Sequence, residues 1–441
     1  MSGVSPSFRL RWTGRCADLS AEDRRGLFDR ATSKDGAVRQ RTGAIIAQVR
    51  ASRDAALYAL AKELDGVSLD SLEVPRAFWT TALDALDLAL RRAMERSAEN
   101  IRRVHRAFLP EVLEFESEPG IIVGRRPDPL GRVGVYAPGG RAAYPSSVLM
   151  GVIPARVAGV GEIVVCSPPL AGTGRPSGVV LAAAALAGAD RVFALGGAGA
   201  IAALAYGTES VPRVDRIVGP GNAYVAEAKI QVASAVAIDS PAGPSELLVI
   251  ADETADPRLV AREMLAQAEH DPLAAVVAVT TSEESAHAVA RALEQMIPSQ
   301  PRAEIVAAAL AGQGAVLWAD SVEAAVGFAN SYAAEHLLLA VASPDATLPS
   351  LRNAGTVFVG AYSSVAFGDY MTGANHVLPT GGLARSYSGL STLDFFRWTS
   401  YQRVTCDAAA RLANDVGVFA DAEGLGGHAI AARAWGETAP A

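Results

Sequence analysis

The chain has 441 residues, of which 50% are hydrophobic and 20% are charged, and its formal net charge at pH 7 is −8. This length exceeds what a single hydrophobic core supports, so we expect two or more domains. The negative charge argues against nucleic acid or anionic lipid as a partner, and no apolar run reaches the length of a membrane span.

The cysteines Cys16, Cys166 and Cys406 lack the spacing of a disulfide framework or of a thiolate metal site. The N-terminus does not show the basic and then apolar pattern of a secretory signal peptide. We therefore expect a cytoplasmic protein.

Residues 17–108 are predicted to be helical. Ser20 is of the residue type that caps helix N-termini, Gly66 is expected to end one helix, and Pro75 is expected to open the next. That last helix runs to about residue 108. His105 lies among arginines on it, so we expect a solvated side chain.

The pattern changes at Gly120, where short apolar runs begin to alternate with alanine-rich helices. This alternation is typical of repeated βα units and a parallel sheet. Strands are predicted at 132–136, 162–166, 191–195, 215–218, 247–251, 274–280, 337–340 and 356–360. In the second half of the chain, helices are predicted at 257–269, 283–296, 303–311 and 321–331.

The sequence thus predicts an α/β fold with two doubly wound, Rossmann-like parallel sheets, before and after about residue 246. A helical extension precedes them. Residues 391–441 are predicted to form a small helical tail, which has too few apolar residues for a core of its own.

Glycine-rich loops are predicted to follow strands at Tyr136-Ala-Pro-Gly-Gly140, Gly196-Gly-Ala-Gly-Ala-Ile-Ala202 and Val218-Gly-Pro-Gly-Asn222. The second fits a relaxed dinucleotide-binding fingerprint, although chance explains one such match about as well in a chain so rich in glycine and alanine. Three loops on one sheet edge favour a nucleotide cleft more strongly than any one of them does.

A segment at Phe367–Pro379 carries Asp369 and His376 together with two glycines and a closing proline. We predict that it is neither a regular helix nor a central strand. Polar side chains on irregular backbone after an apolar strand are where α/β proteins commonly place their chemistry. The plainer interpretation is a turn-capping aspartate and a packed histidine.

Other polar segments lie at the ends of predicted helices. Gln267 and His270 share a helix face, although His270 can also serve there as a favourable charge, and chemistry alone would choose Glu269 as its co-ligand. Glu335 and His336 form an acid–base candidate pair if the chain turns between helix and strand.

The histidines divide into two groups. Four of the six lie in polar junctions, namely His270, His336, His376 and His428. His428 ends the tail segment Glu423-Gly-Leu-Gly-Gly-His428. The other two, His105 and His287, lie on predicted helix surfaces. This division favours a metal or acid–base site.

Several motifs in this order resemble the histidinol dehydrogenase family over nearly the whole chain. They are Gly219–Lys229, Ala242–Glu246, Gln267–His270, Tyr332–Leu337, Gly368–Tyr370 with Asn375–Thr380, and the terminal Glu423 and His428. The resemblance implies oxidation of L-histidinol through the aldehyde to L-histidine, with two NAD per turnover and one zinc ion per subunit.

The resemblance also implies roles for individual residues. The catalytic pair would be Glu335 and His336, and the zinc ligands Gln267, His270, Asp369 and His428. Substrate contacts would come from Ser245, Gln267, His270, His336, Asp369, His376, Glu423 and His428. Contacts to NAD would involve Tyr136, Gly199 and Asn222, although Gly199 stands where the family usually has glutamine, so one contact is missing.

The domain boundaries follow from the same resemblance. Residues 32–136 and 247–390 would form the first α/β domain, with most of the active site, and residues 137–246 an inserted NAD-binding domain. Residues 1–31 would form the N-terminal extension. Residues 391–441 would dock on the partner subunit of a homodimer with shared active sites.

Three other functions remain open from the sequence. One is a related zinc- and NAD-dependent dehydrogenase of another polar alcohol, against which Ser245, His376 and Glu423 argue. Another is a metal-dependent hydrolase, which would not reduce a nicotinamide. The third is a metal- or nucleotide-binding module without catalysis, against which the Glu335–His336 pair argues.

Overall fold

The computed structural model describes residues 9–30, 35–139 and 143–437 of the chain. They fall into a large unit, which spans residues up to Phe108 and Gly131–Phe395, and a small unit, which spans Leu109–Leu130 and the residues from Phe396 on. Across these ranges, no helix is both long and apolar enough to cross a membrane.

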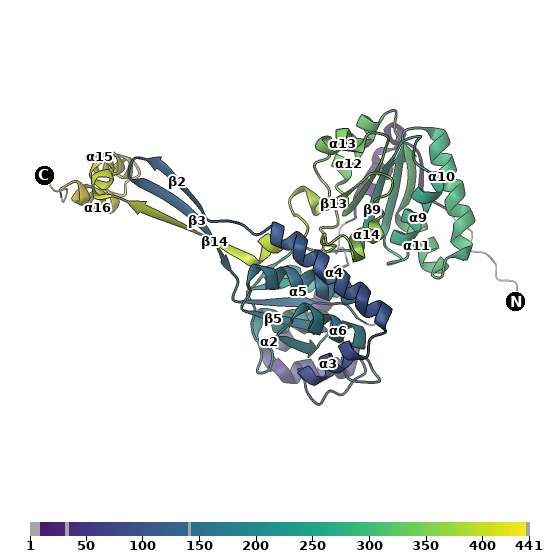
Figure 1. Ribbon diagram of the computed structural model, residues 1–441, viewed down its shortest axis with the longest axis horizontal. Helices are drawn as coiled ribbons and strands as arrows, with labels where there is room; N and C mark the ends of the chain where they lie inside the picture. The colour runs from purple at the N-terminus through teal and green to yellow at the C-terminus, as the bar shows by residue number, and fades with distance from the viewer. Residues whose placement is uncertain (1–8, 31–34, 140–142, 438–441) are drawn as a thin grey trace. The chain divides into compact units, whose positions relative to one another are not determined.

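A six-stranded parallel sheet in the large unit has the strand order β1-β11-β10-β9-β12-β13. Figure 1 labels two of its strands, β9 and β13. Its strands are β1 Trp12–Arg15, β9 Glu246–Ala251, β10 Ala275–Thr280, β11 Gly314–Trp318, β12 His336–Ala340 and β13 Thr356–Val359. Strands β9, β10 and β12 are buried throughout, because helices cover both faces of the sheet.

The side chains of β9 alternate between two cores. Leu247 and Val249 pack with the helices α9 and α11, while Leu248 and Ile250 pack with α12 on the other face. The helices around this sheet are α1 Ala21–Phe28, α9 Pro257–Ala268, α10 Glu283–Met296, α11 Ala303–Gln313, α12 Val322–Tyr332, α13 Pro344–Thr347 and α14 Val365–Tyr370.

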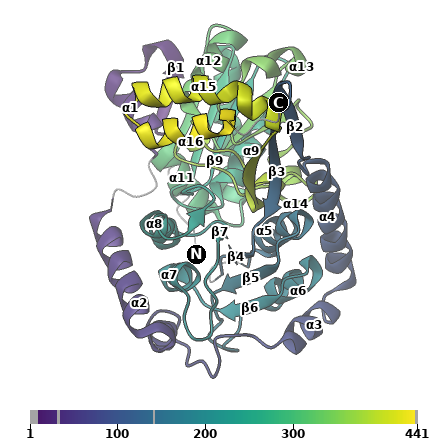
Figure 2. The ribbon, with the colours of Figure 1, turned by 90° about the vertical axis from the view of Figure 1, so that its left-hand side faces the viewer.

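A five-stranded parallel sheet in the same unit has the order β6-β5-β4-β7-β8. Its strands are β4 Arg132–Tyr136, β5 Glu162–Ser167, β6 Arg191–Ala194, β7 Arg216–Val218 and β8 Ala237–Ile238. Figure 2 shows α2, α7 and α8 on one side of this sheet and α5 and α6 on the other. The helices here are α2 Gly36–Leu64, α3 Arg76–Asp84, α4 Leu88–Ala107, α5 Pro145–Ala158, α6 Gly178–Ala187, α7 Gly197–Tyr206 and α8 Ala223–Val232.

The two parallel, doubly wound sheets confirm the predicted fold class. In each sheet the first α/β strand, β4 or β9, lies in the middle. The chain adds the next strands on one side of it and then continues on the other side, which is the Rossmann-type strand order. Strand β4 pairs with β5 and β7, and α2 packs against α7 and α8, so these parts of the range 32–136 lie with the five-stranded sheet. The domain boundaries themselves stay a prediction.

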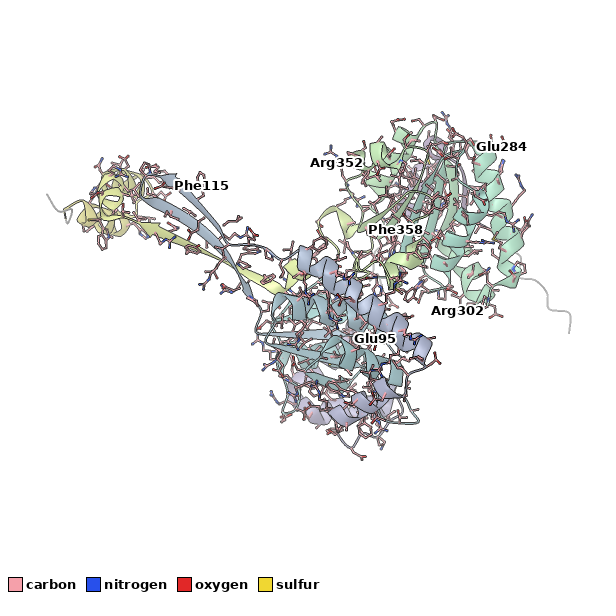
Figure 3. All side chains as sticks on the ribbon, in the orientation of Figure 1. Glu95, Phe115, Glu284, Arg302, Arg352 and Phe358 are labelled. Carbon is pink, nitrogen blue, oxygen red and sulfur yellow. The ribbon has the colours of Figure 1, made fainter. Side chains whose placement is uncertain are left out.

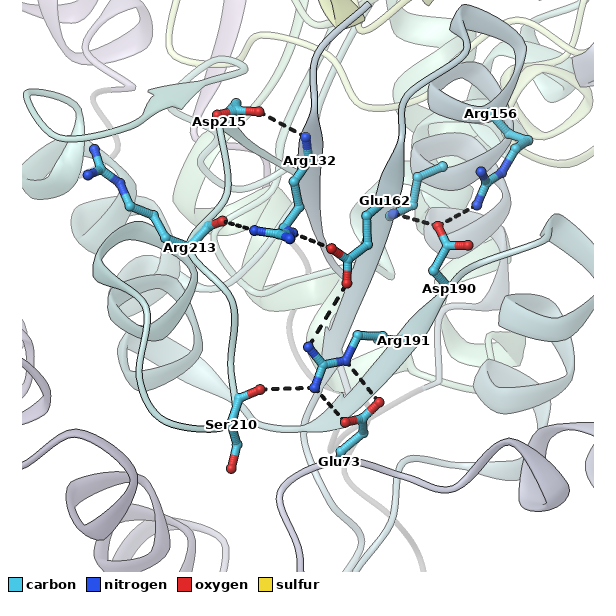
Figure 4. Close-up of polar contacts among 10 residues, drawn as sticks. Glu73, Arg132, Arg156, Glu162, Asp190, Arg191, Ser210, Arg213 and Asp215 are labelled. Carbon is cyan, nitrogen blue, oxygen red and sulfur yellow. Dashed lines mark hydrogen bonds and ion pairs between the residues drawn. The ribbon is translucent and has the colours of Figure 1, made fainter.

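Charged side chains hold the amino ends of β4, β5 and β6 together (Figure 4). Arg191 donates to both carboxylate oxygens of Glu73, at 2.9 and 2.5 Å, and lies 3.9 Å from Glu162. Glu162 also accepts from Arg132. This network lies at the edge of the sheet opposite its glycine-rich loops, so it stabilises the sheet without reaching them.

The small unit contains a three-stranded antiparallel sheet in the order β14-β3-β2 and two helices. These elements are β2 Leu113–Glu118, β3 Ile121–Pro129, β14 Phe396–Val404, α15 Cys406–Ala422 and α16 Gly426–Glu437. The prediction of a purely helical tail was therefore wrong for β14, which pairs with β3 along its whole length. It escaped prediction because its side chains are mostly exposed and strand pairing, not an apolar face, holds it.

Two further expectations were wrong. Asp369 lies in the short helix α14, not in irregular backbone; Gly368 fits there because a Cβ would come within 2.5 Å of the Phe358 ring. His105 is buried, since it continues the stripe of Met94, Ala98 and Ile101 on α4. Short 3₁₀ segments, Cys16–Asp18, Ile297–Ser299, Leu348–Ser350, Leu383–Arg385 and Thr392–Phe395, complete the described elements.

Candidate active site

Glu335, His336 and Asp369 lie together where strands of the six-stranded sheet begin. Glu246 is the first residue of β9 and His336 the first of β12, and the two strands are neighbours. Asp369 reaches the same place, because its Oδ1 lies 3.7 Å from His336 Nε2. Open α/β sheets usually bind ligands at the carboxyl ends of their strands, so this site departs from the rule that guided our prediction.

A sharp turn brings Glu335 and His336 into one site. Helix α12 ends at Tyr332, and Ala333 adopts a left-handed conformation with φ of 55°, which non-glycine residues rarely do. After this turn both side chains are buried, and Glu335 Oε2 lies 3.3 Å from His336 Nδ1. The turn that the sequence required for this pair is therefore present.

Hydrogen bonds define which nitrogen of His336 is available. Nδ1 lies 3.0 Å from the carbonyl oxygen of Glu246 and donates its proton there, because a carbonyl can only accept. Nε2 is buried and has no hydrogen-bond partner among the described residues. Figure 3 shows Phe358 on β13, and its ring centroid lies 6.0 Å from that of His336. In the neutral imidazole, Nε2 is therefore the free proton acceptor.

The charges around His336 favour its protonated form. Burial alone would lower the pKa of His336, but the carboxylates of Glu335 and Asp369 outweigh burial and raise that pKa to about 9. A cation bound by Asp369 would offset one of these two negative charges and bring the pKa back down. The two carboxylates therefore make the surroundings of His336 negative.

His270 and Asp369 offer donor atoms that zinc prefers, namely imidazole nitrogen and carboxylate oxygen, whereas the amide oxygen of Gln267 is a rare zinc ligand. None of these three side chains makes a hydrogen bond within the described ranges, although Gln267 is only 3% exposed. The described residues contain no group of three or more His, Cys, Asp or Glu side chains that could hold a metal ion. The predicted zinc ligands therefore stay a prediction.

His376 lies next to the proposed ligands. Its Nδ1 is 3.0 Å from the carbonyl oxygen of Asp369, and its Nε2 is 3.5 Å from the hydroxyl of Ser147 on α5. Burial lowers the pKa of His376, although the Asp369 carboxylate opposes that effect. Ser245 directly precedes Glu246, and no hydrogen bond of its hydroxyl occurs within the described ranges, so that hydroxyl is available to a ligand.

The glycine-rich loops converge at the carboxyl edge of the five-stranded sheet. The backbone N–H of Gly197 donates to the Tyr136 hydroxyl over 3.1 Å, and a Cβ on Gly219 would lie 2.1 Å from the Tyr136 carbonyl oxygen. Burial raises the pKa of Tyr136 to about 12, so its phenol stays neutral. The three loops are thus neighbours at the reversal of strand order, where Rossmann-type sheets bind nucleotides. Gly140 lies outside the described residues.

Two of the predicted cofactor contacts also have structural tasks. The Asn222 side chain caps α8 and accepts from the backbone N–H groups of Tyr224 and Val225 at 3.1 and 3.2 Å. Gly199 is buried against α2, and a Cβ there would lie 3.1 Å from Leu60. Their roles toward a cofactor stay predictions.

Glu423 and His428 lie in the small unit, at the C-terminal end of α15 and in the first turn of α16, and both are exposed. Their predicted roles as substrate contact and zinc ligand stay predictions.

The sequence interpretation missed a buried ion pair behind Glu335. Arg30 donates to the Glu246 carboxylate, and the two side chains are only 4% and 2% exposed. Burial raises the pKa of Glu246 to about 7 even though Arg30 opposes that shift. Glu246 was quoted within a motif, but nothing local in the sequence connects it with Arg30, 216 positions away.

Comparison with known proteins identifies the family of the chain. The histidinol dehydrogenase family profile matches residues 28–434. The chain is 51% identical over 414 residues to a histidinol dehydrogenase from Natronomonas pharaonis, covering 94% of this chain and 97% of the relative. It is 46% identical to one from Methanosarcina mazei, covering 95% and 96% of the two chains. The crystal structure of histidinol dehydrogenase from Elizabethkingia anophelis superposes with a TM-score of 0.92 at 33% identity, covering 97% of this chain and 98% of that one. The chain therefore belongs to the histidinol dehydrogenase family of oxidoreductases.

Proposed function

We propose that the chain oxidises L-histidinol through L-histidinaldehyde to L-histidine, the last steps of histidine biosynthesis, in the cytoplasm. Over both steps, L-histidinol, two NAD⁺ and one water give L-histidine, two NADH and three protons. Membership of the family supports the reaction class. The observation that carries the proposal at the level of residues is His336, whose Nδ1 is held by the Glu246 carbonyl while its buried Nε2 has no partner.

His336 performs the proton transfers of both oxidations. Its Nε2 takes the proton of the substrate hydroxyl as the hydride leaves the same carbon, and NAD accepts that hydride. Glu335 takes a proton from the water that adds to the aldehyde carbon, and the protonated His336 gives its proton to the aldehyde oxygen, so the hydrate forms and His336 is neutral again. His336 then takes a hydroxyl proton of the hydrate as the second hydride leaves, and burial of both residues keeps the aldehyde away from bulk water.

The remaining site residues bind and orient. Gln267, His270, Asp369 and the partner subunit's His428 would hold one zinc ion per subunit, which would serve as a template that orients the substrate. These four residues also contact the substrate, together with His336, Ser245, His376 and Glu423. Tyr136, Gly199 and Asn222 lie at the loops that receive NAD.

The small unit supports assembly into a homodimer. It exposes large apolar side chains, among them Phe115 on β2 at 71%, visible in Figure 3, and Phe419 and Ile430 at 71% and 72%. Exposed apolar surface of this kind marks an interaction site, and Glu423 and His428 lie on the same unit. A second copy covers this surface, and in a twofold dimer each small unit completes the site of its partner.

The test of the function is a nicotinamide-reduction assay with L-histidinol, with and without a chelator. The account expects NADH formation that chelator removes and zinc restores. A hydrolase or a non-catalytic module would form no NADH. A dehydrogenase of another alcohol would reduce NAD with that alcohol and not with L-histidinol.

A further inference from the structure

Glu246, the first residue of β9, contacts both members of the proposed catalytic pair through its main chain. The backbone N–H of Glu246 donates to Glu335 Oε2 over 2.7 Å, and its carbonyl oxygen accepts from His336 Nδ1 over 3.0 Å. The orientation of both proposed catalytic side chains therefore depends on where the peptide groups of Glu246 lie.

The Glu246 side chain in turn fixes those peptide groups. Its Oε1 accepts from the backbone N–H of Gly381 over 2.7 Å, and its Oε2 accepts from the backbone N–H of Glu335 over 3.3 Å. Glu246 and Glu335 thus bind each other's main chain through their carboxylates. Two buried carboxylates so close repel each other, and a cation must offset that repulsion.

Arg30 is that cation. Its guanidinium donates to Glu246 Oε2 and to the carbonyl oxygen of Tyr332, and it lies 3.5 Å from the centroid of the Tyr332 ring. Tyr332 is the last residue of α12, immediately before the turn that leads to Glu335. The ring of Phe28, two residues before Arg30, packs edge-on against Tyr332 at 5.4 Å and anchors this segment.

We infer that Arg30 and Glu246 are positioning residues for the reaction, an inference that rests on the proposed function. The arginine joins the end of α12 to the Glu246 carboxylate, and Glu246 then presents its N–H to Glu335 and its C=O to His336. Neither side chain touches the substrate. Because the guanidinium is planar and makes both contacts at once, lysine cannot reproduce it.

The variants are Arg30→Ala, Arg30→Lys and Glu246→Gln, assayed for kcat, KM, zinc content and folded state by circular dichroism. Arg15→Ala is the matched control, because Arg15 also ties the N-terminal segment to the rest of the unit, through an exposed ion pair with Asp320. Arg30→Ala is expected to lose about 100-fold in kcat, since small displacements of catalytic groups have effects of that size. Its KM for L-histidinol, zinc content and folded state should match those of the control.

Chemical rescue separates positioning from a structural role. Guanidinium chloride, below concentrations that unfold the protein, is expected to restore part of kcat in Arg30→Ala, while ammonium chloride is not. Arg30→Lys should stay below wild type. Should Arg30→Ala not fold, Arg30→Lys and Glu246→Gln decide, and both are expected to lose kcat at constant KM.

Wild-type kcat in Arg30→Ala would overturn the inference. So would a loss that comes with lost zinc or lost folding in every variant, or one that guanidinium does not relieve in a folded Arg30→Ala protein. These results differ from failure of the proposed function, in which the wild-type chain itself forms no NADH from L-histidinol. If wild type is active, His336→Asn is inactive and Arg30→Ala is fully active, only the positioning role fails.

Discussion

Replacing His336 with asparagine removes the proposed base and keeps its anchor. The asparagine amide nitrogen takes the place of Nδ1 and can donate to the Glu246 carbonyl, which accepts from Nδ1 over 3.0 Å in the native chain. Nothing replaces Nε2, the buried nitrogen without a partner. His336→Gln is the complementary variant, because it places an amide near Nε2 and gives up the bond to Glu246.

Both variants should lose turnover to a similar extent, since an amide cannot accept the substrate proton. A positioned general base contributes about 10²- to 10⁴-fold, which corresponds to about 3–5 kcal/mol of transition-state stabilisation. Only His336→Gln leaves the Glu246 carbonyl without its partner, so its free energy of unfolding should fall by about 1–3 kcal/mol more than that of His336→Asn.

The assay is NADH formation from L-histidinol across the pH range, together with zinc content and substrate binding. His336→Asn should retain zinc and bind L-histidinol. Near-normal turnover of this variant at any pH would refute the assigned role. Loss of activity in His336→Gln alone would show that the bond to Glu246 matters and the base does not.

Four further predictions concern the site and the fold. Glu335→Gln should reduce turnover of L-histidinol more than turnover of supplied L-histidinaldehyde hydrate, since only addition of water needs this carboxylate; equal losses for the two would contradict the division of tasks. His270→Ala and Asp369→Ala should each lose bound zinc, and full zinc occupancy by elemental analysis in both would refute the metal site. Asp369→Asn and His428→Ala, each inactive alone, should regain activity when mixed as heterodimers, and verified heterodimers without activity would rule out a shared site. Burial lowers the pKa of His105 from 6.5 to about 4, so between these pH values the unfolded chain binds a proton that the folded chain does not. The free energy of unfolding should therefore fall by up to about 3 kcal/mol as the pH drops through this range. The urea midpoint of wild type should fall more between pH 7 and 4.5 than that of His105→Gln, and an equal fall in both would contradict this.

The strands that the sequence predicted are those with continuous apolar runs. Residues 132–136 and 274–280 are buried by helices on both faces, and strands buried in this way consist almost entirely of apolar residues. Two of the strands that were missed, β2 and β14, are held differently, whereas β11, Gly314–Trp318, was missed although it is buried and apolar. Every residue of β2 is exposed, so nothing in its apolar pattern distinguishes it from a loop, and β14 lies in a segment expected to be helical.

The candidate site was predictable in its residue types but not in its place. Because Glu335 and His336 are neighbours in the sequence, they can share a site only if the chain turns there, and Ala333 provides that turn. The location at the amino ends of β9 and β12 was not predictable, because it depends on how the chain returns after β13 through α14. The pair of Arg30 and Glu246 was hidden for the same reason, since only the folded chain brings these two residues together.

The central claim is that one site carries out both oxidations. The most direct measurement is the number of NADH formed for each L-histidinol consumed, with the product identified by chromatography or mass spectrometry. The account predicts two NADH per L-histidinol and L-histidine as the only released product. One NADH per L-histidinol with accumulation of L-histidinaldehyde, or no NADH at all, would contradict it.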